Sequence, residues 1–298
     1  MIGWIKDIYQ TLFRFARFPC EPETVSVGNP DKSSPVLVTC NFDYTVRHLK
    51  KYLEKEQLDC FLLVVNTQGT NVWCAAAEGI FTTETVLAHL KVYNVKDLVD
   101  HTRLILPQLS VAGIKRKDLK EHGWEGIYGP VYFTDLKEFL KNGLTKTKEM
   151  QALEYGYWER FKMGLSHAVF CTLVCILPIF LFASDWWLQA IALVWYFAFS
   201  MQLIEHFIPF HRLLYKGLAL TQPVLAIALF SVTDSVLRIQ ATIGIIALGA
   251  YIGYDAQGHS HLGQNQQSGK LFARIFASLA LIYGGSLLLC KYMWIGTR

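Results

Sequence analysis

The sequence predicts a doubly wound α/β domain followed by an all-α transmembrane bundle of five helices. Hydrophobic residues make up 52% of the 298 residues and charged residues only 17%, which is more apolar than is usual for a soluble protein of this size. Most of the charged residues lie before Lys162, and long apolar runs follow it. We therefore expect a soluble N-terminal half and a membrane-embedded C-terminal half.

Changes in these patterns give the domain boundaries. The first residues, MIGWIKDIYQTLFRFARF, are amphipathic, and charges interrupt them too often for a secretory signal. We interpret residues 1–24 as an amphipathic arm, either an interfacial helix or a packing arm. Residues 25–145 are the expected α/β domain, 146–162 the linker and 163–298 the transmembrane domain.

Four short apolar runs predict the strands of the soluble domain: residues 35–41, 60–66, 102–108 and 125–131. Between the first two runs, Val46, Leu49 and Leu53 recur at helical spacing. Strand, helix and strand in this order form a βαβ unit, and continuous apolar strands are typical of a parallel sheet. A hydroxyl at residues 82–83 predicts the start of a further helix, and Gly143 predicts the end of another.

The stretch NVWCAAAEGIF, residues 71–81, lies where such a domain binds ligands. Ligands of doubly wound sheets bind beyond the carboxyl ends of the strands, and this stretch closely follows the strand at 60–66. Asn71 is a suitable N-cap, so Cys74 falls in the first helical turn, where unpaired amides and the helix dipole favour the thiolate. Alanines at 75–77 leave little bulk beside the sulfur. From these residues alone, a buried structural cysteine and a ligand for a large planar partner both stay open.

The remaining composition excludes other kinds of site. None of the seven cysteines forms a CxxC pair or an iron–sulfur ligand run. An odd number of cysteines without a framework is typical of a reducing compartment, so we expect the soluble half to be cytoplasmic. The net charge is only +4 and the basic residues are scattered, which argues against a nucleic-acid surface.

Five segments are apolar enough to cross the ~30 Å of hydrocarbon, which takes ~20 residues: 164–183, 187–205, 213–232, 239–254 and 273–292. Lysines and arginines near their ends place the N-terminal domain in the cytoplasm and the C-terminus outside. The sequence therefore predicts a multi-pass protein of the prokaryotic inner (cytoplasmic) membrane.

Polar residues near these segments leave two interpretations open. Glu205, His206, His211, His259 and His261 could bind a metal or relay protons, or could anchor the helices and solvate the loops. One helical turn separates Cys171 from Cys175, which could chelate a soft metal ion or pack within the bundle.

The hexapeptide NVWCAA closely resembles the cap-helix motif of the mercury-methylating corrinoid protein (HgcA) family. The resemblance extends to VGNPDKSSPVLVTCNF, LVVNTQGTNVWCAA, HTRLILPQLSVAGI and YGPV, and five spans behind the soluble domain match that family's layout. The soluble half also resembles the corrinoid domain of the corrinoid iron–sulfur proteins of acetyl-CoA synthesis. This resemblance implies a Rossmann/flavodoxin-like corrinoid-binding domain.

The resemblance also implies an enzyme, a corrinoid-dependent methyltransferase. In that family's arrangement, Cys74 is the catalytic residue and the lower axial ligand of the cobalt, and methyl transfer to Hg(II) gives methylmercury. The expected cofactor-binding residues are Thr39, Asn41, Asn71, Val72, Trp73, Ala75 and Ala76. No DxHxxG motif offers a histidine ligand instead.

The expected partners follow from the same resemblance. Because the chain has no iron–sulfur ligand run, it should hold no intrinsic iron–sulfur cluster and should rely on a separate ferredoxin-like [4Fe–4S] protein as reductant. A methyl-donor methyltransferase, Hg(II) as substrate and the lipid bilayer complete the set. Two alternatives stay open: a corrinoid methyl carrier of one-carbon metabolism that does not act on mercury, and a non-catalytic membrane scaffold.

Two positions depart from the family pattern. Where the family usually continues Gly-Lys-Gly, this chain has Ala77-Glu78-Gly79, and where it usually reads Thr-Ala-Asn-Tyr-Lys, this chain ends in Asp43. Each departure replaces a lysine by a carboxylate. We expect both carboxylates near the ligand, where they either weaken the attraction for anionic groups or lie solvated at the rim.

Overall fold

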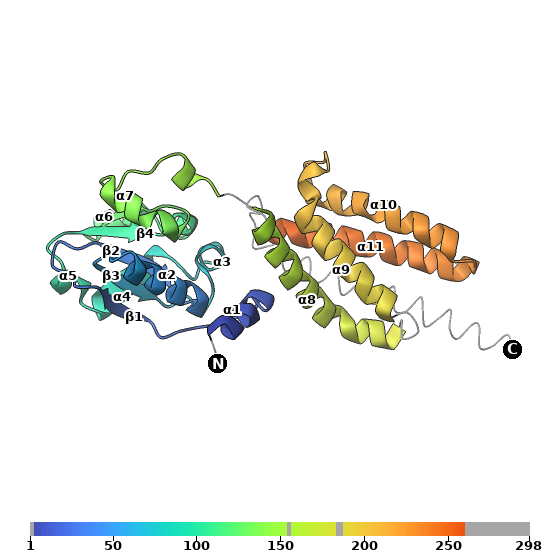
Figure 1. Cartoon of the computed structure of the whole chain (residues 1–298), viewed down its shortest axis with the longest axis horizontal. Helices are drawn as coiled ribbons and strands as arrows, with labels where there is room; N and C mark the ends of the chain where they lie inside the picture. Colours follow the sequence, from blue (N-terminus) through green and yellow to red (C-terminus); the bar gives the residue numbers. More distant parts are fainter. Residues whose placement is uncertain (1–2, 154–155, 183–186, 260–298) are drawn as a thin grey trace. The chain divides into compact units, whose positions relative to one another are not determined.

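The computed structural model describes the chain except for residues 1–2, 154–155, 183–186 and 260–298. It divides into two compact units (Figure 1). The first comprises Met1–Gln10 and Ala16–Glu154, and the second comprises Thr11–Phe15 and Tyr155–Arg298.

The first unit contains a five-stranded mixed sheet in the order β1-β3-β2-β4-β5. Its strands are β1 (Glu23–Val27), β2 (Val36–Cys40), β3 (Cys60–Val65), β4 (Arg103–Leu106) and β5 (Glu125–Tyr128). The last four are parallel, and they confirm the four strands predicted from the sequence. Strand β1 was not predicted; it pairs antiparallel with β3 at the edge of the sheet.

Helices cover both faces of this sheet (Figure 1). The helices of the unit are α1 (Gly3–Leu12), α2 (Asp43–Lys55), α3 (Val72–Ala77), α4 (Thr83–Val92), α5 (Val95–Leu98), α6 (Arg116–Glu121) and α7 (Leu136–Lys141). One buried cluster joins the sheet to α3, α4, α5 and α6, and the other joins it to α2 and α7. Because the strands alternate their side chains between these two clusters, β2, β3 and β4 are buried on both faces, as their continuous apolar sequences predict.

The chain reverses its direction across the sheet beside β2. From β2 it passes to β3 on one side, and it then returns to β4 on the other side. The carboxyl ends of these three parallel strands therefore share one edge, and loops diverge there. Such a switch point is where open α/β sheets bind ligands.

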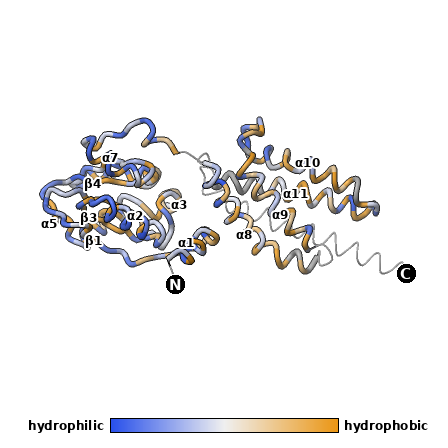
Figure 2. The backbone as a smooth tube through the Cα atoms, viewed as in Figure 1, coloured by the Kyte–Doolittle hydropathy of each residue, from blue (hydrophilic) through white to orange (hydrophobic). Residues whose placement is uncertain are grey.

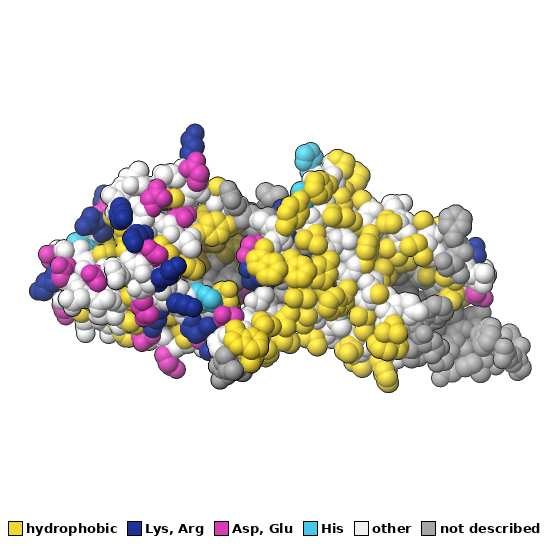
Figure 3. Space-filling model, in the orientation of Figure 1, with side chains coloured by type: hydrophobic (Ala, Val, Ile, Leu, Met, Phe, Trp, Pro, Cys, Tyr) yellow, Lys and Arg dark blue, Asp and Glu magenta, His cyan; other side chains and the backbone are white. Residues whose placement is uncertain are grey.

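The second unit is helical. It contains α8 (Tyr157–Phe182), α9 (Trp187–Leu203), α10 (Leu213–Ser231) and α11 (Ser235–His259). Hydrophobic residues predominate along its helices (Figure 2), and hydrophobic side chains cover much of its visible surface (Figure 3). Inside the unit, the backbones of α10 and α11 approach closely at Gly217. A Cβ added to this residue would lie only 2.2 Å from the carbonyl oxygen of Gly249.

The expectation of five spans holds only in part. Among the described residues, one apolar stretch, Tyr157–Leu177, is long enough to cross a membrane. The apolar parts of the other helices are shorter: Trp187–Leu203, Leu214–Leu229 and Ser235–Tyr251. Helices are present at the first four predicted segments, but only α8 carries an apolar stretch of membrane-crossing length within the described residues. The fifth predicted span, residues 273–292, lies outside the described residues.

The structure favours the packing interpretation for Cys171 and Cys175. Cys171 and Cys175 both contribute to an apolar cluster with α9, α10 and α11. The ring of His206 packs on Phe207 at 3.9 Å between centroids. Within the described part of the chain, no three His, Cys, Asp or Glu side chains lie close enough to hold a metal ion; His261 lies outside that part.

Candidate functional site

The short helix α3 starts as its sequence predicts. The side chain of Asn71 accepts a hydrogen bond from the backbone N–H of Cys74 at 2.9 Å, and Asn71 itself is extended, with φ −66° and ψ 163°. This is the geometry of an N-cap. The cap therefore fixes Cys74 in the first turn of a helix that follows the carboxyl end of β3.

The two faces of α3 differ in what they contact. Ala75 and Ala76 are buried in the domain core, and Val72 packs against the same cluster. Trp73 and Cys74 are half-buried, whereas Ala77 is exposed. A partner on the outer face would therefore meet Trp73, Cys74 and Ala77, while Ala75 and Ala76 hold the helix against the domain.

The loop after β4 lies directly against α3. The 3₁₀ turn η1 (Gln108–Ser110) packs beside the helix. A Cβ added to the nearby Gly113 would lie 2.1 Å from the carbonyl oxygen of Phe81 and 3.2 Å from the Cα of Ala76. Only glycine at residue 113 permits this close approach of two backbones.

Asn41 connects the ends of β2 and β3. Its Oδ1 accepts hydrogen bonds from the backbone N–H groups of Thr67 at 2.8 Å and Gly69 at 3.0 Å. Its Nδ2 donates to the carbonyl oxygen of Cys20 at 2.9 Å, and the side chain is 2% exposed. This side chain is used to hold the loop that leads into α3. Thr39, also expected at the site, is buried inside β2.

The segment that follows α1 completes this edge of the sheet. The backbone N–H of Phe18 donates to the carbonyl oxygen of Gly69, and the N–H of Asp43 donates to the carbonyl oxygen of Phe18. Arg17 Nη2 lies 4.0 Å from Glu78 Oε2, and both side chains are more than half exposed. This ion pair therefore contributes little to the stability of the fold. Glu78 is thus a solvated rim residue, as one of the two expectations had it.

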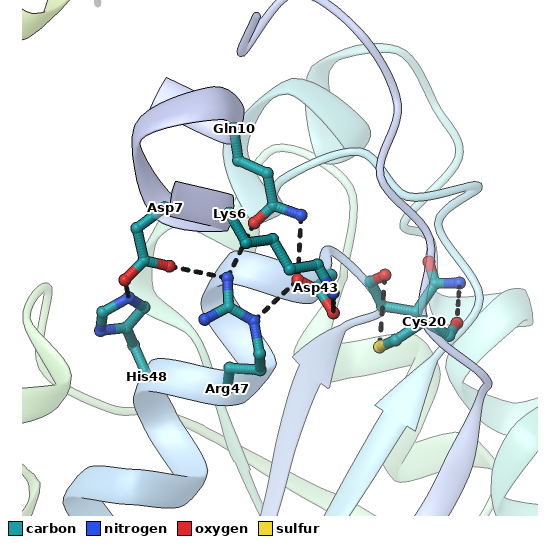
Figure 4. A network of polar contacts seen from close by, with 8 residues as sticks. Lys6, Asp7, Gln10, Cys20, Asp43, Arg47 and His48 are labelled. Carbon is teal, nitrogen blue, oxygen red and sulfur yellow. Dashed lines mark hydrogen bonds and ion pairs between the residues drawn. The ribbon is translucent and has the colours of Figure 1, made fainter. Parts of the chain in front are cut away.

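Asp43 is not a rim residue. It is 9% exposed and lies among Lys6, Gln10 and Arg47 (Figure 4). Lys6 Nζ and Arg47 Nε each lie 2.8 Å from its carboxylate, and Gln10 Nε2 donates to it at 2.9 Å. Burial alone would raise the pKa of Asp43, but the hydrogen bonds from Lys6, Arg47 and Gln10 outweigh burial and lower the pKa. The expectation of a solvated rim position is therefore wrong for Asp43, because its carboxylate pairs with Lys6 of α1 and Arg47 of α2.

His89 and Cys20 also lie at this edge, and sequence reasoning missed both. The backbone N–H of Asn66 donates to His89 Nε2 at 3.1 Å, while His89 Nδ1 lies 2.8 Å from the carbonyl oxygen of Thr85. The imidazole thus holds the first residue of the loop that leads to α3. The spacing of Thr85 and His89 by one helical turn was the only sequence signal.

The first unit contains three further cysteines, Cys20, Cys40 and Cys60. Burial raises the pKa of Cys40 to about 11 and, together with the charge of Asp59, that of Cys60 to about 12. Burial also raises the pKa of Cys20, whose sulfur lies 3.5 Å from the carbonyl oxygen of Asn41. These thiols are structural and stay protonated at neutral pH.

Comparisons with known proteins identify relatives of the first unit. Residues 6–140 match the family described as CO dehydrogenase/acetyl-CoA synthase delta subunit. The acetyl-CoA decarbonylase/synthase complex subunit gamma of Methanopyrus kandleri is 37% identical over 130 residues, which are 43% of this chain and 28% of that protein. The corrinoid/iron-sulfur protein large subunit of Moorella thermoacetica is 32% identical over 147 residues, which are 48% of this chain and 32% of that protein.

The chain thus spans about a third or less of the length of these relatives. The α/β domain is related to the acetyl-CoA synthase gamma and corrinoid iron–sulfur proteins, as the wider resemblance led us to expect. Nothing in these matches is specific to mercury methylation.

Proposed function

We propose that the α/β domain binds a corrinoid and carries a methyl group on it, with Cys74 as the protein ligand of the cobalt. The observation that carries this proposal is the placement of Cys74 in an Asn71-capped turn that follows the carboxyl end of β3, in a domain related to a corrinoid/iron-sulfur protein. The relationship favours one-carbon metabolism as the setting, with the chain acting as a methyl carrier.

The residues present fit this group. Around Cys74, no described cluster of His, Cys, Asp or Glu could hold a bare metal ion. A corrinoid brings its own equatorial nitrogens, so one soft protein ligand is enough. When bound, the corrinoid supplies a cobalt–carbon bond that carries the methyl group.

Each neighbouring residue has a physical task in this proposal. Asn71 holds the helical turn that presents the sulfur, and Asn41 fixes the preceding loop to the end of β2. The indole of Trp73 offers apolar surface beside the sulfur and excludes water there. Ala77, one turn beyond Trp73, leaves room for a planar ring.

Corrinoid binding tests the proposal on the full chain in lipid nanodiscs. Reconstitution with cobinamide, which lacks a nucleotide base of its own, should give a cobalt–thiolate absorption spectrum. Cys74→Ala should abolish this spectrum, and the control Cys20→Ala, at the same edge of the sheet, should retain it. A spectrum unchanged in Cys74→Ala excludes Cys74 as the ligand.

A second candidate is methyl transfer to Hg(II) by a membrane-anchored enzyme. The helical second unit favours it, because a soluble corrinoid domain followed by apolar helices is the layout of the mercury-methylating family. We propose that this unit lies in the inner membrane with the α/β domain in the cytoplasm. A ferredoxin-like [4Fe–4S] protein would serve as reductant and a separate methyltransferase as methyl donor.

Isotopically labelled Hg(II) distinguishes the two candidates. The purified full chain, loaded with methylated corrinoid and supplied with a low-potential reductant, should release labelled methylmercury if the second candidate is right. Glu78→Lys should then raise the turnover without changing the melting temperature, because Glu78 is an exposed rim residue. Corrinoid binding without methylmercury leaves the one-carbon carrier.

A further inference from the structure

Helix α1 is attached to the α/β domain by its polar face (Figure 4). Besides the contacts of Asp43 with Lys6 and Gln10, Arg47 Nη2 lies 2.7 Å from Asp7 Oδ1 and donates to Gln10 Oε1 at 3.0 Å. Gln10 is only 2% exposed. The helix is therefore held by an ion-pair and hydrogen-bond network in its own domain.

The apolar face of α1 points away from the domain. Trp4 is 62% exposed, Ile5 39% and Ile8 51%. This is the reverse of an ordinary surface helix, which buries its apolar face and solvates its polar face. Contiguous exposed apolar side chains indicate an interaction surface.

The position of α1 relates this surface to the candidate site. Asp43 begins α2 directly after β2, and α3 follows the parallel strand β3. Both helices therefore start at the carboxyl edge of the sheet, and α1 is attached to that same edge. Residues 18–20 continue along it, bonded to Asn41 and Gly69.

We propose that the exposed face of α1 lies in the interfacial layer of the lipid bilayer and thereby turns the Cys74 edge of the sheet towards the membrane. This inference rests on the proposed membrane location of the second unit, and it does not depend on corrinoid binding. The methyl acceptor or its carrier then reaches Cys74 from the membrane side of the domain.

Three observations favour lipid over a protein partner. Tryptophan and tyrosine are typical of membrane interfaces, and α1 carries Trp4 and Tyr9. Residues Thr11–Phe15, which end α1 and follow it, group with the helical unit. In that unit the ring centroids of Phe15 and Phe170 lie 4.9 Å apart. Phe170 belongs to Tyr157–Leu177, the stretch long enough to cross a membrane. Residues 11–15 thus connect α1 directly to the helical unit.

Photocrosslinking of the full chain in nanodiscs of phosphatidylethanolamine and phosphatidylglycerol tests the lipid contact. Ile8→p-benzoylphenylalanine should form lipid adducts on irradiation, and Trp4→p-benzoylphenylalanine provides an independent position. The matched control is the same substitution at Asp100, which is exposed. Its backbone N–H donates to the carbonyl oxygen of Lys32, before the amino end of β2, so this residue lies at the opposite edge of the sheet. Asp100 should form no lipid adducts.

Energy transfer to acceptor-labelled lipids tests the orientation. A fluorescent amino acid at Glu78 should be quenched more strongly than the same amino acid at Asp100. Equal or reversed quenching would overturn the orientation of the site.

The bilayer contact would be overturned by absence of lipid adducts at both α1 positions, by adducts at Asp100 to the same extent, or by crosslinks between two copies of the chain. Loss of corrinoid binding with these results intact would remove only the proposed function.

Discussion

The carboxylate of Asp43 lies 2.8 Å from the ammonium group of Lys6, across 37 positions of the sequence. This pair joins the first helix of the chain to the first residue of α2, beside the loop that carries Asn41. The carboxylate of Asp43 thus receives Lys6 and Arg47 and attaches α1 to α2.

Asp43→Asn should weaken this attachment. The amide cannot neutralise Lys6 and Arg47, and loss of hydrogen bonds to charged groups costs about 2 kcal/mol. The free energy of unfolding of the first unit should fall, and amides of residues 3–10 should exchange faster with deuterium. Asp100→Asn is the control, because that residue is exposed. Asp43→Lys should be worse, since it places a third cation beside the other two. Unchanged exchange in both variants would contradict the role of Asp43.

The same network should make the fold sensitive to acid. Burial opposes ionisation of both Asp7 and Asp43, yet hydrogen bonds lower the pKa of each. Arg47 and His48 lower the pKa of Asp7. The hydrogen bonds described above lower the pKa of Asp43. A carboxyl group whose folded-state pKa is below its unfolded value of about 3.9 stabilises the fold above that pH. This stability is lost as the pH falls through the folded-state pKa. The melting temperature should drop below about pH 4, and less steeply in Asp43→Asn; parallel curves would contradict this.

Asn41→Ala should disturb the loop before α3. The backbone N–H groups of Thr67 and Gly69 would lose a buried acceptor, and such a loss costs about 1–3 kcal/mol. The melting temperature should fall, and the affinity for cobinamide should fall with it. Asn66→Ala is the control on the same loop, because its side chain accepts one hydrogen bond at an exposed position. A similar effect of the two substitutions would contradict the role of Asn41.

Gly113→Ala tests the close contact behind the site. A methyl group would lie 2.1 Å from a carbonyl oxygen of the backbone, which cannot move as a side-chain end can. We expect displacement of the loop after β4, a lower melting temperature and weaker cobinamide binding. Gly79→Ala is the control, because it introduces backbone strain at a positive φ without a steric clash. At Gly79 no atom lies within 4 Å of the added carbon, although φ is +72°. If Gly113→Ala and Gly79→Ala lower the melting temperature equally, the close backbone contact is not the reason for glycine at residue 113.

Local patterns in the sequence predicted what depends on local structure. The four parallel strands and the Asn71 cap follow from apolar runs and from side-chain chemistry within a few residues. The docking of α1 on Asp43, the clamp of Asn41 on residues 67 and 69, and the edge strand β1 depend on contacts between distant segments. No single stretch encodes these contacts. For the helical unit, apolar composition predicted the described helices α8 to α11. A composition window does not fix where each apolar stretch begins and ends: those of α9 and α10 are shorter than predicted, and that of α11 begins and ends earlier.

Asn71→Ala should affect Cys74 without changing the sulfur itself. The variant removes the acceptor for the backbone N–H of Cys74, and loss of such a cap costs about 1 kcal/mol. Because α3 has only six residues, the loss should fray the turn that holds the thiol. Cobinamide should then bind more weakly, while the spectrum of the bound form stays that of a thiolate complex. Asn71→Asp keeps an acceptor at the same position and should retain most of the affinity. If alanine and aspartate at residue 71 bind cobinamide equally well, the cap does not position Cys74.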